Sequence, residues 1–337
     1  MKKKLFIISN ESIYNHNGNF LCDNIDLKSI PEELNKNFEV HLIGRKSKKM
    51  RTLKIDIKNI KLISNIFSLL KILFQSTKKD KKKYLLISIS PFTFLSMLIL
   101  KLFGQKISLY LRSDGFKEYK SIIGFYGPAI YHFMFFFVVR LSNLIACRKH
   151  LLRGHKGEIV SPSHLNDNWL RNYSPPDLKS VKLLYIGRLK VEKGIFSLFK
   201  ILENSNINLI AVTSEKEINL NKVFKNINIL SFENYNDTII KFYDENNIFI
   251  LPSFTEAHPQ VLDEALARQR SVIIFSEISH VVRDRKGVFT AERNLNSLNE
   301  KINYIMKNYH IIQGDLKKNR LPTKSQFINQ LTQILSS

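Results

Sequence analysis

A repeated alternation along the chain is the strongest constraint on its fold. Short apolar runs alternate with longer segments of helical period, the pattern of parallel strands covered by helices on both faces. The pattern occurs twice, on either side of residues 172–177, where Pro175 and Pro176 interrupt regular structure. With 337 residues, 44% of them hydrophobic, the chain can bury two cores. We therefore predict the α/β class, with two doubly wound domains.

The predicted domains are an N-terminal domain (1–172), a linker (173–180), a C-terminal domain (181–320) and a helix (321–337) that packs back toward the N-terminal domain. In the first half we expect strands at 5–9, 39–43, 85–90, 106–111, 143–147 and 158–161, with helices at 23–35, 60–76, 92–103 and 122–141. In the second half we expect strands at 182–187, 208–212, 227–230, 248–252, 271–275 and 287–290.

Several classes of site are excluded by what the sequence lacks. Cys22 and Cys147 cannot form a disulfide framework, and no Cys/His cluster has the spacing of a zinc site. The common nucleotide-binding, esterase and zinc-protease motifs are absent. The chain also lacks an Asp-x-Asp pair, so we predict that no metal is used and that any diphosphate is bound by side chains and backbone N–H groups.

The positive charge is concentrated in the first half of the chain. The formal charge is +23, and residues 1–170 hold 29 Lys and Arg against 12 Asp and Glu. This favours an anionic membrane surface or an acidic acceptor as partner. A solvated basic surface and nucleic acid are the alternatives, with nucleic acid the least favoured.

The apolar stretches predict a protein that does not cross the membrane. The N-terminal apolar run is too short for a signal peptide, and the uncharged stretches 84–100 and 125–139 are at or below the lower length limit of a membrane span. We therefore expect a cytoplasmic protein, peripheral at the inner face of the cytoplasmic membrane.

The first chemical motif is residues 183–194, an apolar strand that ends at Gly187-Arg188 and leads to a helix expected near Lys193. Such a turn presents free backbone N–H groups and the positive end of a helix dipole. Arg188 and Lys193 add two full charges, so the segment predicts a diphosphate-binding site. The alternative is a strand, turn and helix that carry surface cations.

The second motif is residues 248–267. An apolar strand runs to Pro252, a loop carries Glu256, Pro259 is expected at the first helical position, and Glu264 follows in the helix. The spacing of the two glutamates is not informative, because Glu292 and Glu300 share it. The strand, loop and proline-opened helix set the first pair apart, and they predict that this pair points into a cleft.

This arrangement suits a glycosyl donor. Free N–H groups from Ala257 to Val261 can bind a phosphate or sugar oxygen, and Glu264 can accept hydrogen bonds from ribose hydroxyls. Glu256 can hold a sugar hydroxyl and stabilise positive charge at the anomeric carbon. The alternative for Glu264 is an ion pair with Arg268, one helical turn later.

Together the two motifs resemble the retaining GT-B glycosyltransferases, the glycosyl transferases group 1 family. The resemblance implies two Rossmann-like domains that face each other across a cleft. It also implies that Gly-Arg-(x)n-Lys-Gly binds the diphosphate and that Glu-x7-Glu binds the donor sugar and the ribose. The implied catalytic residues are Glu256, Lys193 and Arg188, and the implied donor-binding residues are Arg188, Lys193, Glu256, Ala257, His258, Pro259, Gln260, Val261 and Glu264.

Other positions depart from the family pattern. The family's Glu-Gly-Phe-Pro is Glu-Ala-His-Pro here, and His258 has a packed, hydrogen-bonding role as its alternative. The family's paired glycine after the first strand is represented by Gly18 alone, and Arg112-Ser-Asp114 replaces its histidine after the fourth strand. Candidate cleft residues of the first domain, each with a structural alternative, are Gly18, Arg112, Asp114 and His150.

The resemblance implies a retaining, metal-independent transfer of sugar from a nucleotide-diphosphate sugar to a glycan or lipid-linked acceptor, in bacterial surface polysaccharide or lipopolysaccharide synthesis. No cofactor is expected, since the nucleotide sugar is a co-substrate. One alternative is another GT-B enzyme, an epimerase or a small-acceptor transferase. A second is a basic protein that binds nucleic acid or polysaccharide with a degenerate donor site, although the intact carboxylate pair argues against it.

Overall fold

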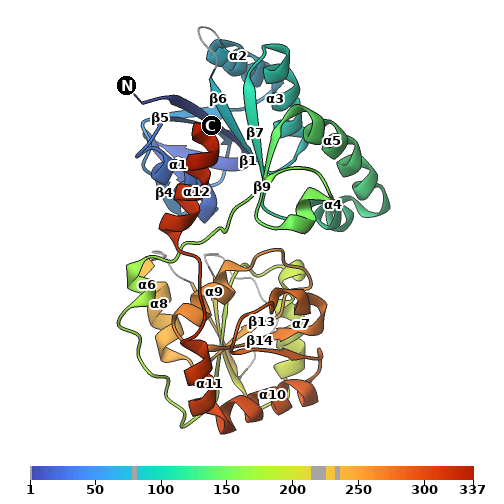
Figure 1. The fold of residues 1–337 in the computed structure, drawn as a ribbon. Coiled ribbons are helices and arrows are strands. Elements are labelled where there is room, and N and C mark those ends of the chain that lie inside the picture. The colour runs from blue at the N-terminus through green and yellow to red at the C-terminus, as the bar shows by residue number, and fades with distance from the viewer. Residues whose placement is uncertain (1, 78–81, 214–224, 232–235) are drawn as a thin grey trace. The chain divides into compact units, whose positions relative to one another are not determined.

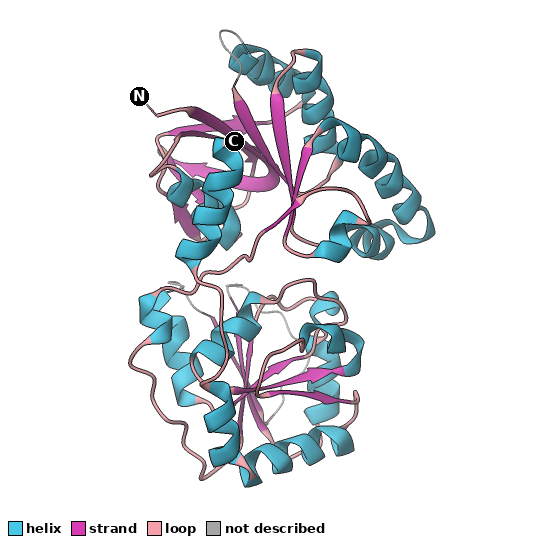
Figure 2. Cartoon of the chain, in the orientation of Figure 1, coloured by secondary structure: helices cyan, strands magenta, loops and turns pink. Residues whose placement is uncertain are grey.

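The chain forms two compact units. The computed structural model describes residues 2–77, 82–213, 225–231 and 236–337. Unit 1 comprises Met1–Ser161 together with Ser325–Ser337, and unit 2 comprises Pro162–Lys324 (Figure 1). In both units helices alternate with the strands of a central sheet (Figure 2), which confirms the predicted α/β class.

The sheet of unit 1 is doubly wound. Its parallel strands have the spatial order β5-β3-β1-β6-β7-β8-β9, which reverses direction along the chain between β1 and β6. A short antiparallel extension, β2 and β4, pairs with the far end of β1. The strands are β1 (Lys4–His16), β2 (Asn19–Cys22), β3 (Glu39–Lys46), β4 (Leu53–Ile55), β5 (Asn59–Ile63), β6 (Lys83–Ile87), β7 (Lys106–Leu111), β8 (Asn143–Ala146) and β9 (Glu158–Ile159).

Helices cover this sheet. Contacts join α2 to α3, α3 to α5 and α4 to α5, so these four helices form one continuous layer (Figure 1). Helix α3 begins at Pro91 because Ser90 and Thr93 form a reciprocal capping box. The helices are α1 (Ile25–Leu34), α2 (Ile66–Thr77), α3 (Pro91–Leu102), α4 (Gly115–Ile123), η1 (Gly124–Tyr126), α5 (Gly127–Leu141), η2 (Lys149–Leu152) and α12 (Lys324–Ser336).

Two helix predictions in unit 1 were wrong at their start. The helix predicted at 60–76 begins only at Ile66, because Ile60 to Ile63 pair with β3 as strand β5. The helix predicted at 122–141 begins at Gly127. Gly124 has a φ of +74°, which ends α4 and separates it from α5.

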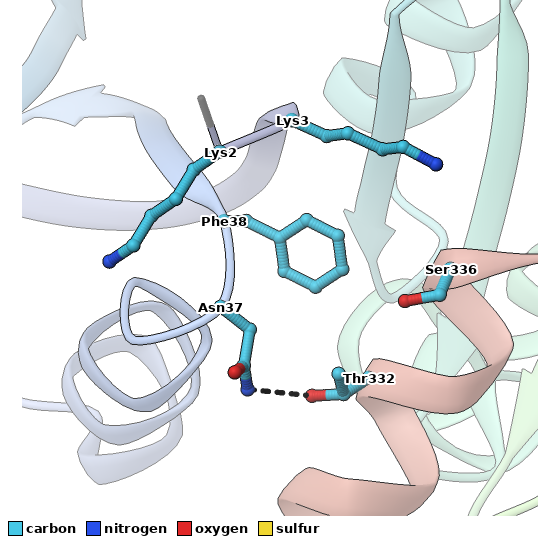
Figure 3. Close-up of a pocket in the computed structure, with 6 residues that line it drawn as sticks. All are labelled: Lys2, Lys3, Asn37, Phe38, Thr332 and Ser336. Atoms are coloured by element: carbon cyan, nitrogen blue, oxygen red, sulfur yellow. Dashed lines mark hydrogen bonds between the residues drawn. The ribbon is translucent and has the colours of Figure 1, made fainter.

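A shallow pocket lies at the edge of the unit 1 sheet where the strands begin. Lys2 and Lys3 precede β1, and Asn37 and Phe38 precede β3, while α12 closes the other side through Thr332 and Ser336 (Figure 3). Doubly wound sheets bind ligands at the opposite, carboxyl edge. We therefore assign this pocket to the packing of α12, where Asn37 Nδ2 donates to Thr332 Oγ1 at 3.4 Å.

Unit 2 is a second doubly wound domain. Its six strands are parallel, in the spatial order β12-β11-β10-β13-β14-β15, which reverses between β10 and β13. Every residue of β13 and β14 is buried, as expected for strands covered on both faces. The strands are β10 (Lys182–Ile186), β11 (Asn208–Thr213), β12 (Ile227–Ser231), β13 (Ile248–Leu251), β14 (Ser271–Phe275) and β15 (Val288–Ala291).

The helices of unit 2 are α6 (Asp167–Leu170), η3 (Val191–Lys193), α7 (Ile195–Leu202), α8 (Asn236–Glu245), α9 (Gln260–Ala267), η4 (Ser276–Val281), α10 (Leu295–Lys307) and α11 (Tyr309–Leu316). The first segment of unit 1 ends at Ser161, eleven residues before the predicted end of the N-terminal domain at 172, and unit 2 starts at Pro162. Leu165 and Trp169 account for the difference, because both are buried in the core of unit 2 and Trp169 stacks edge-on against Tyr243.

Candidate functional site

The two motifs meet at the point where the strand order of unit 2 reverses. Strands β10 and β13 are neighbours, and the first motif follows β10 while the second follows β13. The two loops are joined directly, since the Phe254 N–H donates to the Glu192 carbonyl at 3.1 Å. Open α/β sheets bind ligands outside the carboxyl ends of the strands at this kind of position.

Lys193 and Glu256 form an ion pair at this edge. The Lys193 Nζ lies 2.6 Å from Glu256 Oε1, and the Ser253 hydroxyl donates to the same oxygen at 2.7 Å. Their side chains are 26% and 11% exposed, so the pair lies at a surface that solvent and ligand can reach. A cation and an anion 63 residues apart in sequence are thus held together. Arg188 is exposed in the loop between β10 and η3.

Gly194 makes the close approach of the two loops possible. Its φ is +66°, and a Cβ at this position would lie 1.8 Å from the Pro252 carbonyl oxygen at the end of β13. The helix expected near Lys193 in fact begins at Ile195, because Lys193 ends the short helix η3 and Gly194 turns the chain into α7. The glycine of the motif is therefore required for packing of the site.

We expect Gly194→Ala to destabilise unit 2 and to displace the Lys193 loop. A residue with a side chain in this conformation costs about 1–3 kcal/mol, and the collision with Pro252 adds to that cost. Urea unfolding measures the loss. Gly104→Ala is the matched control, because Gly104 has the same φ of +66° with nothing within 4 Å of its Cβ position. Equal decreases in the free energy of unfolding of the two variants would show that the collision with Pro252 does not contribute to the destabilisation.

The Glu256 loop is anchored by residues that the sequence analysis missed. Arg293 Nη2 donates to the Pro252 carbonyl at 2.9 Å, its Nε donates to Glu277 at 2.6 Å, and its guanidinium lies 4.0 Å from the centre of the Phe254 ring. His280 Nε2 lies 2.8 Å from the Glu256 carbonyl. Burial alone would raise the pKa of Glu277, but the hydrogen bond from Arg293 lowers it below its ordinary value.

A simple signal could have identified Arg293. It comes two residues after β15, at the same carboxyl edge of the sheet as Glu256. The rule that selects the residues after β10 and β13 also selects the residues after β15.

The segment 257–261 opens helix α9. Pro259 is the N-cap, with an extended ψ of 107°, and Gln260 is the first helical residue, so the prediction that Pro259 occupies the first helical position was wrong by one residue. Ala257, Gln260 and Val261 are half-buried, as is Glu256. The binding of donor oxygens by the backbone N–H groups of this segment stays a prediction.

Glu264 is buried in α9. Its side chain accepts a hydrogen bond from the Tyr243 hydroxyl at 3.0 Å, and only 1% of its surface is exposed. The Arg268 guanidinium is directed to Asp244, at 2.7 Å, and to the main-chain carbonyls of residues 168, 169, 171 and 172. The geometry therefore disfavours the alternative in which Glu264 serves mainly as the ion-pair partner of Arg268.

His258 is packed inside unit 2. Its side chain is 3% exposed, and its Nε2 lies 2.7 Å from the Pro162 carbonyl and 3.4 Å from Asp263 Oδ2. Asp263 also accepts two hydrogen bonds from Arg285, at 2.6 and 2.8 Å. This geometry favours the packed, hydrogen-bonding alternative for His258 over a contact with the donor.

Arg112 is the centre of an ionic cluster in unit 1. Its guanidinium lies 2.9 Å from Asp26, 3.4 Å from Glu11, 3.3 Å from the Asn24 side chain and 3.4 Å from the Ser88 hydroxyl. Burial alone would lower the pKa of Arg112, but the carboxylates of Asp26 and Glu11 raise it above its ordinary value. The cluster joins the carboxyl ends of β6 and β7 to Glu11 inside β1 and to Asp26 of α1. Its two carboxylates were not predicted from the sequence.

The other three candidates of unit 1 are not part of this cluster. Gly18, with a φ of +84°, forms the exposed Asn-Gly turn of the β1–β2 hairpin. Asp114 caps α4 through the Phe116 N–H at 3.1 Å and lies 3.7 Å from Arg153. His150 is exposed in η2, which follows β8. Within the described residues, no group of three His, Cys, Asp or Glu side chains has the geometry of a metal site.

Comparison with known families identifies the second unit. Residues 169–321, which contain both motifs, match the family model described as glycosyl transferases group 1. Unit 2 therefore contains a glycosyl transferases group 1 domain.

The chain also has relatives among curated proteins and solved structures. It is 26% identical over 204 residues to the capsular polysaccharide biosynthesis glycosyltransferase CapM of Staphylococcus aureus, a match that covers 56% of this chain and 50% of the relative. HepE from Anabaena, solved in complex with UDP and glucose, superposes with a TM-score of 0.71 at 12% identity over 100% of both chains. WaaG, a glycosyltransferase involved in lipopolysaccharide biosynthesis, superposes with a TM-score of 0.66 at 11% identity, over 98% of this chain and 100% of WaaG. The fold is therefore GT-B, as the sequence predicted.

Proposed function

We propose that this chain transfers a sugar from a nucleotide-diphosphate sugar, which unit 2 binds at the carboxyl ends of β10 and β13. The observation that carries the proposal is the Lys193–Glu256 ion pair at 2.6 Å, at the point where the strand order reverses. The pair combines a cation suited to a diphosphate with a carboxylate suited to a sugar hydroxyl. UDP-sugars are the first donors to test, because the HepE structure contains UDP and glucose.

In the proposed reaction, Lys193 and exposed Arg188 neutralise the diphosphate as it leaves, without a metal ion. When the donor binds, Lys193 leaves its ion pair with Glu256 and binds a phosphate oxygen instead. Glu256 can then accept a hydrogen bond from a sugar hydroxyl. The N–H groups at the start of α9 bind further donor oxygens. Tyr243 orients Glu264 toward the ribose. The proposal includes retention of the anomeric configuration.

The proposed acceptor is a glycan or a lipid-linked saccharide of a bacterial surface polysaccharide or lipopolysaccharide. The similarity to CapM, of capsular polysaccharide biosynthesis, and to WaaG, of lipopolysaccharide biosynthesis, supports this class of acceptor. The basic first half of the chain suits an acidic or membrane-bound acceptor. The protein would then act in the cytoplasm, peripheral to the inner face of the cytoplasmic membrane.

We expect one class among UDP-, GDP- and ADP-sugars to raise the melting temperature of the protein in the presence of EDTA, because a ligand that binds only the folded state stabilises it. Glu264→Ala should reduce this ligand-induced increase, since the ribose would lose a carboxylate acceptor. Differential scanning fluorimetry measures the increase relative to each variant's own melting temperature without ligand.

Glu300→Ala is the matched control for this experiment, because Glu300 is exposed on α10. Its ligand-induced increase should equal that of the wild type. A wild-type protein that none of the three nucleotide sugars stabilises would contradict the proposed donor. Stabilisation that EDTA abolishes would contradict the metal-independent part.

A further inference from the structure

The layer formed by α2, α3, α4 and α5 has an apolar outer surface. At the turn between α4 and α5, the exposed fractions are 76% for Ile122, 89% for Phe125 and 72% for Tyr126. Farther along α5, Phe133 and Phe136 are also exposed. We call Ile122, Ile123, Phe125, Tyr126, Phe133 and Phe136 the apolar hairpin surface. Exposed apolar patches of this kind mark interaction sites.

This surface differs from the rest of unit 1. In α5 the residues Tyr131, Met134 and Val138 form the buried stripe, so the exposed phenylalanines lie on a second apolar face. The apolar surface extends over the neighbouring helices through Phe67 and Phe74 of α2 and Leu102 of α3. Among the described residues of α1 and α12, by contrast, no large hydrophobic side chain is exposed.

The same four helices are basic. Between them they carry Lys71, Lys101, Lys117, Lys120 and Arg140, all exposed, and Glu118 is their one acidic residue. The Arg140 guanidinium lies 3.6 Å from the centre of the Phe136 ring, so cation and apolar surface are contiguous. Exposed aromatic side chains together with cations fit a bilayer that contains anionic lipid headgroups.

The geometry also decides how this segment can meet a membrane. Residues Gly115–Leu141 are long and apolar enough for a membrane span, and 28% of their most apolar window is buried. They do not form one helix, because α4 ends at Gly124 and packs against α5, with Phe116 stacked edge-on against Tyr131. Helix α5 has 15 residues, or about 22 Å, whereas the hydrocarbon core is about 30 Å thick.

We infer that the apolar hairpin surface docks on an anionic bilayer and lies in its interface. Ile122, Phe125 and Tyr126 insert below the headgroups, and the lysines of the same helices contact the lipid phosphates. The purpose that we give to this docking, which is to bring unit 1 to a lipid-linked acceptor, rests on the proposed function. The docking itself requires no donor.

Vesicle flotation tests the inference. We expect the full chain to float with vesicles of phosphatidylcholine and phosphatidylglycerol, and at least tenfold less with phosphatidylcholine alone or at high salt, because salt screens the lysine–phosphate attraction. The double variant Ile122→Glu/Phe125→Glu should lower binding to the anionic vesicles at least tenfold. Met50→Glu/Ile311→Glu is the matched control, since both side chains are exposed outside this surface.

Equal vesicle binding by the two double variants would overturn the inference, as would equal binding of wild type to neutral and anionic vesicles. A wild-type dimer that Ile122→Glu/Phe125→Glu dissociates, without any vesicle binding, would assign the surface to a second copy instead. A nucleotide sugar should raise the melting temperature of both double variants, because neither changes the donor site. Loss of vesicle binding can therefore be distinguished from failure of the proposed donor.

Insertion depth can be measured with one further variant. Phe125→Trp places a second tryptophan at the tip of the hairpin, while the native Trp169 is buried in unit 2 and serves as a constant background. Brominated acyl chains should quench the new fluorescence in anionic vesicles. Vesicle binding without quenching would contradict insertion.

Discussion

Replacing Lys193 with alanine is expected to lower the turnover number about 10²- to 10³-fold, the usual cost of removing one group that stabilises transition-state charge. In the proposed mechanism this side chain neutralises the departing diphosphate. The fold should be preserved, because Lys193 is 26% exposed and Glu256 keeps its hydrogen bond from Ser253. Initial rates with a saturating donor, together with an unchanged melting temperature, provide the measurement.

Lys190→Ala is the matched control for Lys193→Ala. Lys190 is an exposed lysine in the same loop, directly before η3, so its removal changes the net charge equally. Its turnover number should stay within about twofold of the wild type, as expected for a surface charge that touches no reacting group. A similar decrease in both variants would mean that Lys193 acts through general electrostatics and not through contact with the donor.

The largest expected effect on stability is that of Arg268→Ala, which should lower the free energy of unfolding by about 3–5 kcal/mol. Arg268 is 1% exposed, and its N–H groups donate to Asp244 and to the carbonyls of residues 168, 169, 171 and 172. Truncation would leave a carboxylate and several carbonyls without these donors. Urea unfolding monitored by Trp169 fluorescence measures the loss.

Arg171→Ala serves as the control, because Arg171 forms an ion pair with Asp167 in which both side chains are more than 70% exposed. Exposed pairs contribute about 0–1 kcal/mol. Equal losses in the two variants would contradict the role given to Arg268. Arg270 lies 3.6 Å from Asp244 Oδ1, but its N–H groups donate to the carbonyls of Tyr243 and Ser174 and not to those that Arg268 contacts. Burial lowers the pKa of Arg270 to about 10, which still leaves it charged at neutral pH.

Much of the fold could be predicted from the sequence because the buried parallel strands are continuous apolar runs. Strands β7 and β14 have the predicted bounds, and β13 differs by one residue. Strands β2, β4 and β5 were missed. They are short and partly exposed, and they depend on pairing with β1, β2 and β3, respectively, so their own residues carry little signal.

The candidate site could be predicted where it follows from strand order. Lys193 and Glu256 come from loops after neighbouring strands, and the structure brings them together at 2.6 Å. The supporting residues could not be found this way. Arg293 and His280 anchor the Glu256 loop from segments 24 to 41 residues away, and Tyr243 reaches Glu264 from α8. Tertiary packing determines such partners, so they cannot be predicted from a local sequence pattern.

The position of α12 has a consequence for the order in which the polypeptide can mature. Unit 2 is inserted into unit 1, and its two ends are tied together, since the Ser163 hydroxyl donates to the Pro322 carbonyl and the Lys324 N–H donates to the Leu165 carbonyl. During synthesis the ribosome therefore completes the whole inserted domain before α12 emerges. Until then the surface around Tyr110, which Phe327 of α12 later contacts, stays exposed. Unit 1 therefore begins to be synthesised first but is completed only after unit 2.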